Sequence, residues 1–285
     1  MVFKTFLFSL LVLFGGAANA LININILTVY SPGAANAFGG FNGASSNTAV
    51  QIAVTNTVLN NSGIGSSNNG VMVTSVGTLI VLNPDLDLNP VLAIDKLESN
   101  FAVAKARDLN NADVVILINN YNVNVSGWNT QGIAGQYNPN LTSLAQKAST
   151  AFAVVTLQSL PSYTYQHELG HILGAEHQIH NPAIASPNYA YPLMVLYGNN
   201  CYVTIMYSDP ATGCTQTHGG GVISSRIGQY STYGFPYNSA WGDSTHNNAR
   251  RILEIAPTVA QYHTIKLLKG MTVRLLTVPM FIMLQ

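Results

Sequence analysis

HELGHILGAEH, residues 167–177, is the stretch that decides the fold of this chain. It sets three histidines, a glutamate and a glycine at the spacing HExxHxxGxxH, and histidine is scarce, with 7 among 285 residues. Two histidines four positions apart on a helix lie within about 40° of each other, so both imidazoles can reach one metal ion. Leu169 and Leu173 fall on the opposite side and are predicted to pack into the core.

The third histidine needs a turn in the chain. If the helix continued to His177, that side chain would point away from His167 and His171. Gly174 resolves this, because glycine tolerates the left-handed conformation that ends a helix and lets the chain come back. We therefore expect His177 to be the third metal ligand, and the position of Gly174 favours it over His180.

This ligand set indicates a chemistry. Three protein nitrogens leave one coordination position of zinc open, which is typical of a catalytic rather than a structural site. Glu168 is predicted to be the general base that takes a proton from a zinc-activated water. We expect one catalytic zinc ion, held by His167, His171 and His177, in an endopeptidase that acts on a protein or peptide substrate. The alternative is a catalytically silent binding or adhesion module on the same fold.

A second motif follows 29 residues after His177. Thr204-Ile205-Met206-Tyr207-Ser208 is predicted to bring a methionine against the histidine rings. With the zinc motif, it makes the chain resemble the metzincin zinc metallopeptidases, in the reprolysin-like bacterial branch that includes peptidyl-aspartate metalloendopeptidases. The resemblance covers about residues 23–263, and its weaker pieces are Ile24–Pro32, Ala151–Val155, Arg226–Ser231 and Asn247–Arg250.

The resemblance implies an α+β, zincin-like (metzincin) catalytic domain. Such a domain has a mixed five-stranded sheet with helices above an irregular lower subdomain, and a cleft between the halves. The chain departs from relatives at two places. Astacins and serralysins carry a tyrosine two positions after the methionine, whereas Tyr207 follows it directly, so its part in catalysis is open. Reprolysins usually have aspartate after the third histidine, where this chain has Gln178. No cysteine-switch sequence is present.

The N-terminus is predicted to direct export. Residues 1–20 form a signal peptide, with Lys4, an apolar run that is too short to span a membrane, and the cleavage site Ala18-Asn19-Ala20. We expect a secreted or periplasmic protein, and an oxidising compartment favours a disulfide between Cys201 and Cys214 over a metal site.

Composition bounds the partners. Charged residues make up 8% of the chain and the net charge is zero, so no basic patch predicts nucleic-acid binding. We expect residues 21–264 to form the catalytic domain. The apolar tail, 265–285, is interrupted by charges and a proline and is not expected to be an integral span; an interfacial segment, a packed extension and a disordered end stay open. The sequence leaves the oligomeric state open. Asp85 and Asp87 offer a weak calcium alternative.

The hydrophobic pattern alternates strands and helices. Residues 178–245 are rich in Gly, Pro, Tyr, Ser and Asn and are expected to be mostly loop. Strands are expected at Leu21–Tyr30, Val71–Leu82, Asp113–Ile118 and Phe152–Leu157. Helices are expected at Asn47–Asn60, Pro90–Arg107 (one or two), Ser162–Leu173 and Thr245–Tyr262, the last interrupted or kinked at Pro257.

Overall fold

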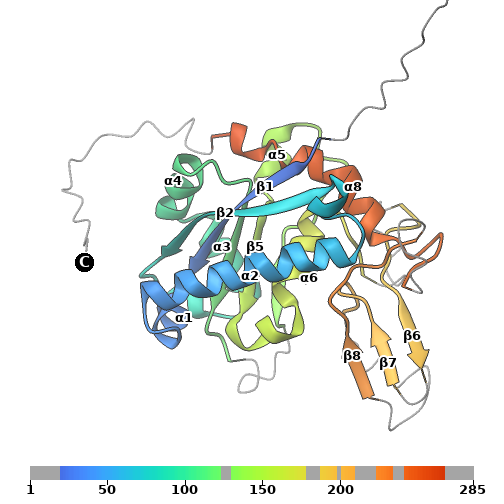
Figure 1. Cartoon of the computed structure of the whole chain (residues 1–285). Helices are drawn as coiled ribbons and strands as arrows, with labels where there is room; N and C mark the ends of the chain where they lie inside the picture. The colour runs from blue at the N-terminus through green and yellow to red at the C-terminus, as the bar shows by residue number, and fades with distance from the viewer. Residues whose placement is uncertain are drawn as a thin grey trace, which may run out of the picture.

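A five-stranded sheet forms the centre of the computed structural model, which describes residues 20–122, 130–177, 187–197, 200–208, 223–233 and 241–266 (Figure 1). The strand order is β2-β1-β3-β5-β4. The first four strands in this order run parallel, and β4 pairs antiparallel with β5 at the edge. The predicted mixed five-stranded sheet is therefore confirmed. The strands are β1 (Ile22–Tyr30), β2 (Val71–Ile80), β3 (Val114–Asn119), β4 (Gly132–Ala134) and β5 (Phe152–Thr156).

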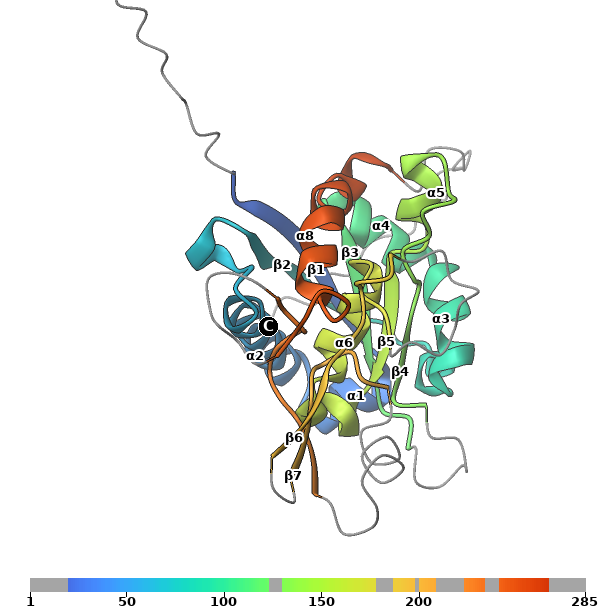
Figure 2. The same cartoon turned by 90° about the vertical axis from the view of Figure 1, so that its right-hand side faces the viewer.

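Helices cover both faces of this sheet (Figure 2). One face carries α2 (Phe41–Asn61), α6 (Thr164–Ile172) and α8 (Asn248–Val259), and the other carries α3 (Pro90–Glu98) and α4 (Phe101–Leu109). Every residue of β3 and β5 is buried, which explains why both sequences are continuous apolar runs instead of alternating ones. The layers thus place α6 directly on the sheet.

Asparagine and serine caps set several helix boundaries. Asn89 and Asn100 accept backbone N–H groups at the starts of α3 and α4, so the segment expected to hold one or two helices holds two. The sequence reading did not include α1 (Pro32–Ala37) or α5 (Leu144–Ala148). The capping box of Ser143 and Gln146 was a readable signal for α5. Four 3-10 turns complete the described helices: η1 (Ser66–Asn68), η2 (Pro84–Asp87), η3 (Leu157–Ser162) and η4 (Tyr262–Thr264).

A second sheet of three short strands lies within residues 178–245, and most of the described residues in this segment are outside strands, in agreement with the expectation that it is mostly loop. Three strands, in the order β6-β7-β8, lie apart from the central sheet (Figure 1). They are β6 (Met194–Tyr197), β7 (Asn200–Val203) and β8 (Ile223–Arg226). Each strand has only four residues, too few for an alternating pattern to stand out from its polar surroundings. Parallel pairing of β7 with β8 brings Val203 opposite Arg226.

Asp87, at the end of η2, is part of a hydrogen-bond network. Asp87 accepts hydrogen bonds from the hydroxyl of Ser31 and from the backbone N–H groups of Gly33 and Asn120. This carboxylate therefore ties α1 to the end of β3, and the calcium alternative stays a prediction. Within the described ranges, no helix combines the length and the apolar character needed to cross a membrane. Residues 1–19 and the tail from 267 onward lie outside those ranges.

Candidate metal centre

Helix α6 carries the first two histidines of the motif. It starts after Tyr163, which has φ 60°, and all nine of its residues are buried. Leu169 and Leu173 are fully buried in the main core, as their predicted position on the helix requires. The opposite side of α6 is thus left for His167 and His171.

The predicted turn at Gly174 is confirmed. Gly174 has φ 82°, the N–H of Ala175 donates to the carbonyl of Gly170 at 2.9 Å, and α6 ends there in a left-handed cap. Beyond the turn, the Glu176 N–H donates to the carbonyl of Ala190 and to Asn248 Oδ1, both at 3.1 Å. Asn248, the first residue of α8, fixes the returning segment one residue before the third histidine, and the sequence reading gave it no role.

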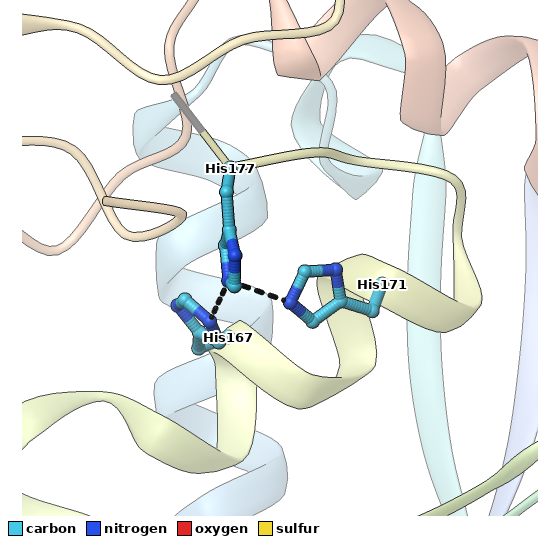
Figure 3. Close-up of side chains that lie close together, drawn as sticks. All are labelled: His167, His171 and His177. Carbon is cyan, nitrogen blue, oxygen red and sulfur yellow. Dashed lines mark hydrogen bonds between the residues drawn. The ribbon is translucent and has the colours of Figure 1, made fainter. Parts of the chain in front are cut away.

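The three histidines of the motif converge (Figure 3). His167 and His171 extend from α6, and His177 reaches them from the returning segment. The Nε2 atom of His177 lies 2.9 Å from Nε2 of His167 and 2.9 Å from Nε2 of His171. Within the described residues, these three histidines form the one group of at least three potential ligands that lie close enough together to hold a metal ion.

The outer ring nitrogens explain why this cluster fits a cation. His167 Nδ1 lies 2.8 Å from the carbonyl oxygen of Ile205, and His171 Nδ1 lies 3.1 Å from that of Ala175. A carbonyl only accepts, so both Nδ1 atoms carry the proton and both Nε2 atoms present lone pairs to His177. One proton on His177 can satisfy only one of them, whereas a metal ion binds all three. Tetrahedral zinc with bonds of about 2.0–2.1 Å would separate its nitrogens by roughly 3.3 Å, close to the spacing found here.

Burial keeps these histidines neutral, as metal ligands must be. It lowers the pKa of His167 well below the ordinary value, and the nearby His171 and His177 add to this effect. The same cause lowers the pKa of His171 to about 3 and that of His177 to about 4. All three imidazoles are therefore neutral, with one proton each, near pH 7.

Glu168 follows His167 on α6, and its side chain lies against the edge strand. Its side chain is buried, and burial raises the pKa of the carboxyl to about 8, while the positive charge of Arg226 opposes this rise. A Cβ atom built on Gly132 of β4 would fall 2.5 Å from Glu168 Oε1. The carboxyl group therefore sits over the backbone of β4, at a position that only glycine leaves open.

Met206 packs against the helix between the two histidines. It is fully buried, and a Cβ on Gly170 would lie 2.4 Å from its sulfur and 3.0 Å from the ring of Tyr230. The turn is closed by the Tyr207 N–H, which donates to the carbonyl of Thr204 at 3.1 Å. The Tyr207 ring packs against Cys201 and Val203 of the second sheet.

Arg226, at the end of β8, joins this turn to the start of α6. Its guanidinium donates to the carbonyl of Ser162 at 2.8 Å and to that of Tyr207 at 2.7 Å. Its charge adds to the effect of burial in lowering the pKa of His167 and His177, and it opposes the rise that burial causes in the pKa of Glu168. Arg226 lies in one of the weaker pieces of the family resemblance, Arg226–Ser231. A lone arginine in a short strand has no characteristic spacing, so the sequence does not reveal that it joins the methionine turn to α6.

The remaining histidines divide into two groups. His246 contacts the Asp243 carboxylate at 2.8 Å and His263 contacts that of Asp113 at 2.7 Å, so each of these two rings has a carboxylate partner. His180, the alternative third ligand, lies outside the described residues, as do His218, Gln178 and Cys214.

Comparison with known proteins gives one family. A sequence model of reprolysin type, described as metallo-peptidase family M12, matches residues 22–218. A search of curated proteins found no match. The solved structure titled "Structure of a chaperone-substrate complex" is similar over 86% of this chain and 35% of that chain, with 19% sequence identity and a TM-score of 0.59, which reflects the fold. "Crystal Structure of metalloproteinase-II from Bacteroides fragilis" matches over 57% of this chain and 45% of that chain, at 20% identity and a TM-score of 0.36.

Proposed function

Because the chain belongs to metallo-peptidase family M12, within the reprolysin-like metzincins, we propose that it is a secreted zinc-dependent endopeptidase. The observation that carries this proposal is the convergence of three Nε2 atoms, two of them from the helix that also carries the buried carboxyl group of Glu168. A protein that merely bound a metal would gain nothing from burying Glu168 there, because burial of a carboxyl without a reaction to perform costs free energy. The substrate is a protein or peptide.

In this proposal His167, His171 and His177 hold one zinc ion. When bound, zinc supplies a Lewis acid that polarises a carbonyl group and lowers the pKa of water. Glu168 accepts the water proton and passes it to the leaving amine. Arg226 favours the ionised carboxylate, against the burial that raises its pKa to about 8, and a cation held by the histidines would favour it further. The carbonyls of Ile205 and Ala175 orient the histidine rings.

Metal analysis tests the ligand assignment. The purified protein is expected to hold about one equivalent of zinc. The substitution His177→Ala should abolish zinc binding, while His180→Ala should retain it. The reverse pattern would transfer the third ligand to His180.

The role of Glu168 has a separate test. Glu168→Gln should keep the fold and the zinc content but reduce hydrolysis of casein or gelatin by several orders of magnitude, since the base acts in the transition state. A chelator should abolish wild-type hydrolysis. Wild-type turnover by the zinc-loaded variant would exclude this mechanism, and no hydrolysis by either protein across a broad peptide library would favour a silent binding module.

A further inference from the structure

We infer that Gly132 is a positioning residue, whose missing side chain leaves the space that the Glu168 carboxyl group occupies. A Cβ atom at Gly132 would lie 2.5 Å from Oε1, 2.9 Å from Cδ and 2.9 Å from Cγ of Glu168. These separations are well below the 3.5–4.0 Å at which carbon atoms pack favourably. An alanine at position 132 and the present position of the Glu168 carboxyl group are therefore incompatible.

Hydrogen bonds before and after Gly132 along the chain hold its backbone in place, so the backbone cannot easily move away from α6. Gly132 pairs with Val155 in the antiparallel ladder between β4 and β5. Just before it, the carbonyl of Gln131 accepts the N–H of Thr156 at 2.9 Å and the hydroxyl of Ser159 at 3.2 Å. Just after the strand, the N–H of Gly135 donates to Phe152 at 2.9 Å. These contacts hold the backbone of β4 against β5.

Small residues line the side of this strand that faces α6. Side chains alternate along a strand, so Gly132 and Ala134 share one face and Ile133 takes the other. Ala134 packs with the core that includes α6, and Ile133 packs with the core on the opposite face of the sheet. Glycine and alanine at alternate positions allow α6 to approach β4 closely.

The position of the Glu168 carboxyl group depends on the backbone of β4 at Gly132. No described residue donates a hydrogen bond to its oxygens, and the space above Gly132 is the part of its surroundings that an alanine would fill. The atoms that an alanine would strike belong to the far end of a flexible side chain. The substitution should therefore displace the carboxyl group and leave the backbone where it is.

The test compares the same substitution at the two edges of one sheet. Gly132→Ala should lower kcat on the order of 100-fold, the loss typical of a misplaced catalytic group, while KM, zinc content and melting temperature stay near wild type. Gly77→Ala, in the opposite edge strand β2, is the control, because its nearest neighbour would be at an ordinary 3.4 Å. It should change none of these quantities.

A double-mutant cycle shows whether the effect passes through Glu168. In a Glu168→Ala background the clash is gone, so adding Gly132→Ala should leave the residual rate unchanged. An equal 100-fold loss in both backgrounds, or wild-type kcat in the single variant, would overturn the inference.

The inference rests on the proposed function only in its kinetic tests, because those tests need an active enzyme. If the wild-type protein hydrolyses nothing, crystal structures of wild type and Gly132→Ala still decide the matter. A displaced Glu168 carboxyl group supports the positioning role, and an unmoved one refutes it.

Discussion

His167 and His171 use both ring nitrogens, and this double use makes the cluster a rigid donor set. The Nδ1 atom of each contacts a backbone carbonyl while Nε2 faces the other rings. Carbonyl acceptors fix both the tautomer and the ring orientation. The carbonyl on which His167 depends belongs to Ile205, the residue directly before Met206, so the methionine turn serves the site through its backbone as well as its side chain.

Met206 should tolerate a change of shape far better than a loss of volume. Met206→Leu nearly conserves volume and is expected to cost less than about 1.5 kcal/mol of folding free energy. Met206→Ala leaves a cavity beside Gly170 and is expected to cost roughly 2–5 kcal/mol. Denaturant unfolding of the two variants measures the difference. Equal stabilities would mean that this side chain does not support α6.

The residues that could be predicted from the sequence are those with a spacing rule. Helical geometry and the glycine turn pointed to His167, His171 and His177, and the structure brings these three together. Gly132, Arg226 and Asn248 had no such rule. Each acts across a tertiary contact between segments far apart in the chain, and only the fold reveals those contacts.

At the scale of elements, the end of α6 is the critical boundary. Gly174 turns the chain in a left-handed conformation, and a Cβ there would also lie 3.0 Å from Ile255 and 3.2 Å from Arg251 of α8. The turn therefore has to satisfy both a backbone conformation and a close approach between α6 and α8. The same turn aims His177 at the cluster.

Substitutions at Gly39 and Gly174 separate the cost of the left-handed backbone from the cost of the close approach to α8. Gly39 has φ 78° with nothing near its missing side chain, so Gly39→Ala should cost only the left-handed strain, about 1–2 kcal/mol. Gly174→Ala should cost more, because it adds the contact with α8, and it should weaken zinc binding by displacing His177. Chemical denaturation and a zinc competition assay measure the two effects. Equal stability losses with unchanged zinc affinity would show that the approach of α8 does not constrain this turn.

Elements with a strong local signal were predictable, and those built by tertiary context were not. The continuous apolar sequences of β3 and β5 indicate buried strands, because both faces of the sheet are covered there. In contrast, β4 has three residues and contains a glycine, and the strands β6, β7 and β8 have four each. Their pairing partners hold them in place, and a local pattern of that length cannot indicate strand formation.

At the scale of the whole molecule, the first described strand starts just after the predicted signal cleavage site. That strand begins at Ile22, whose N–H donates to the carbonyl of Gly70 at 2.9 Å, so a chain that begins at Leu21 would keep the pairing between β1 and β2 intact. Cys201 is fully buried in β7, close in sequence to the methionine turn, and its predicted partner is Cys214. A disulfide between them would fasten the segment that carries Met206 and would suit an exported protein.

We therefore expect the mature protein to begin at Leu21 and to contain a Cys201–Cys214 bond. A closed loop of this length should contribute roughly 3 kcal/mol, so the double variant Cys201→Ser/Cys214→Ser should unfold at lower denaturant concentration than the oxidised protein. N-terminal sequencing and mass analysis without reductant read the two features directly. A start far downstream would contradict the cleavage site, and two free thiols would contradict the bond. If the bond is present but its loss leaves stability unchanged, the turn under α6 is held by Met206 and Arg226 without help from the disulfide.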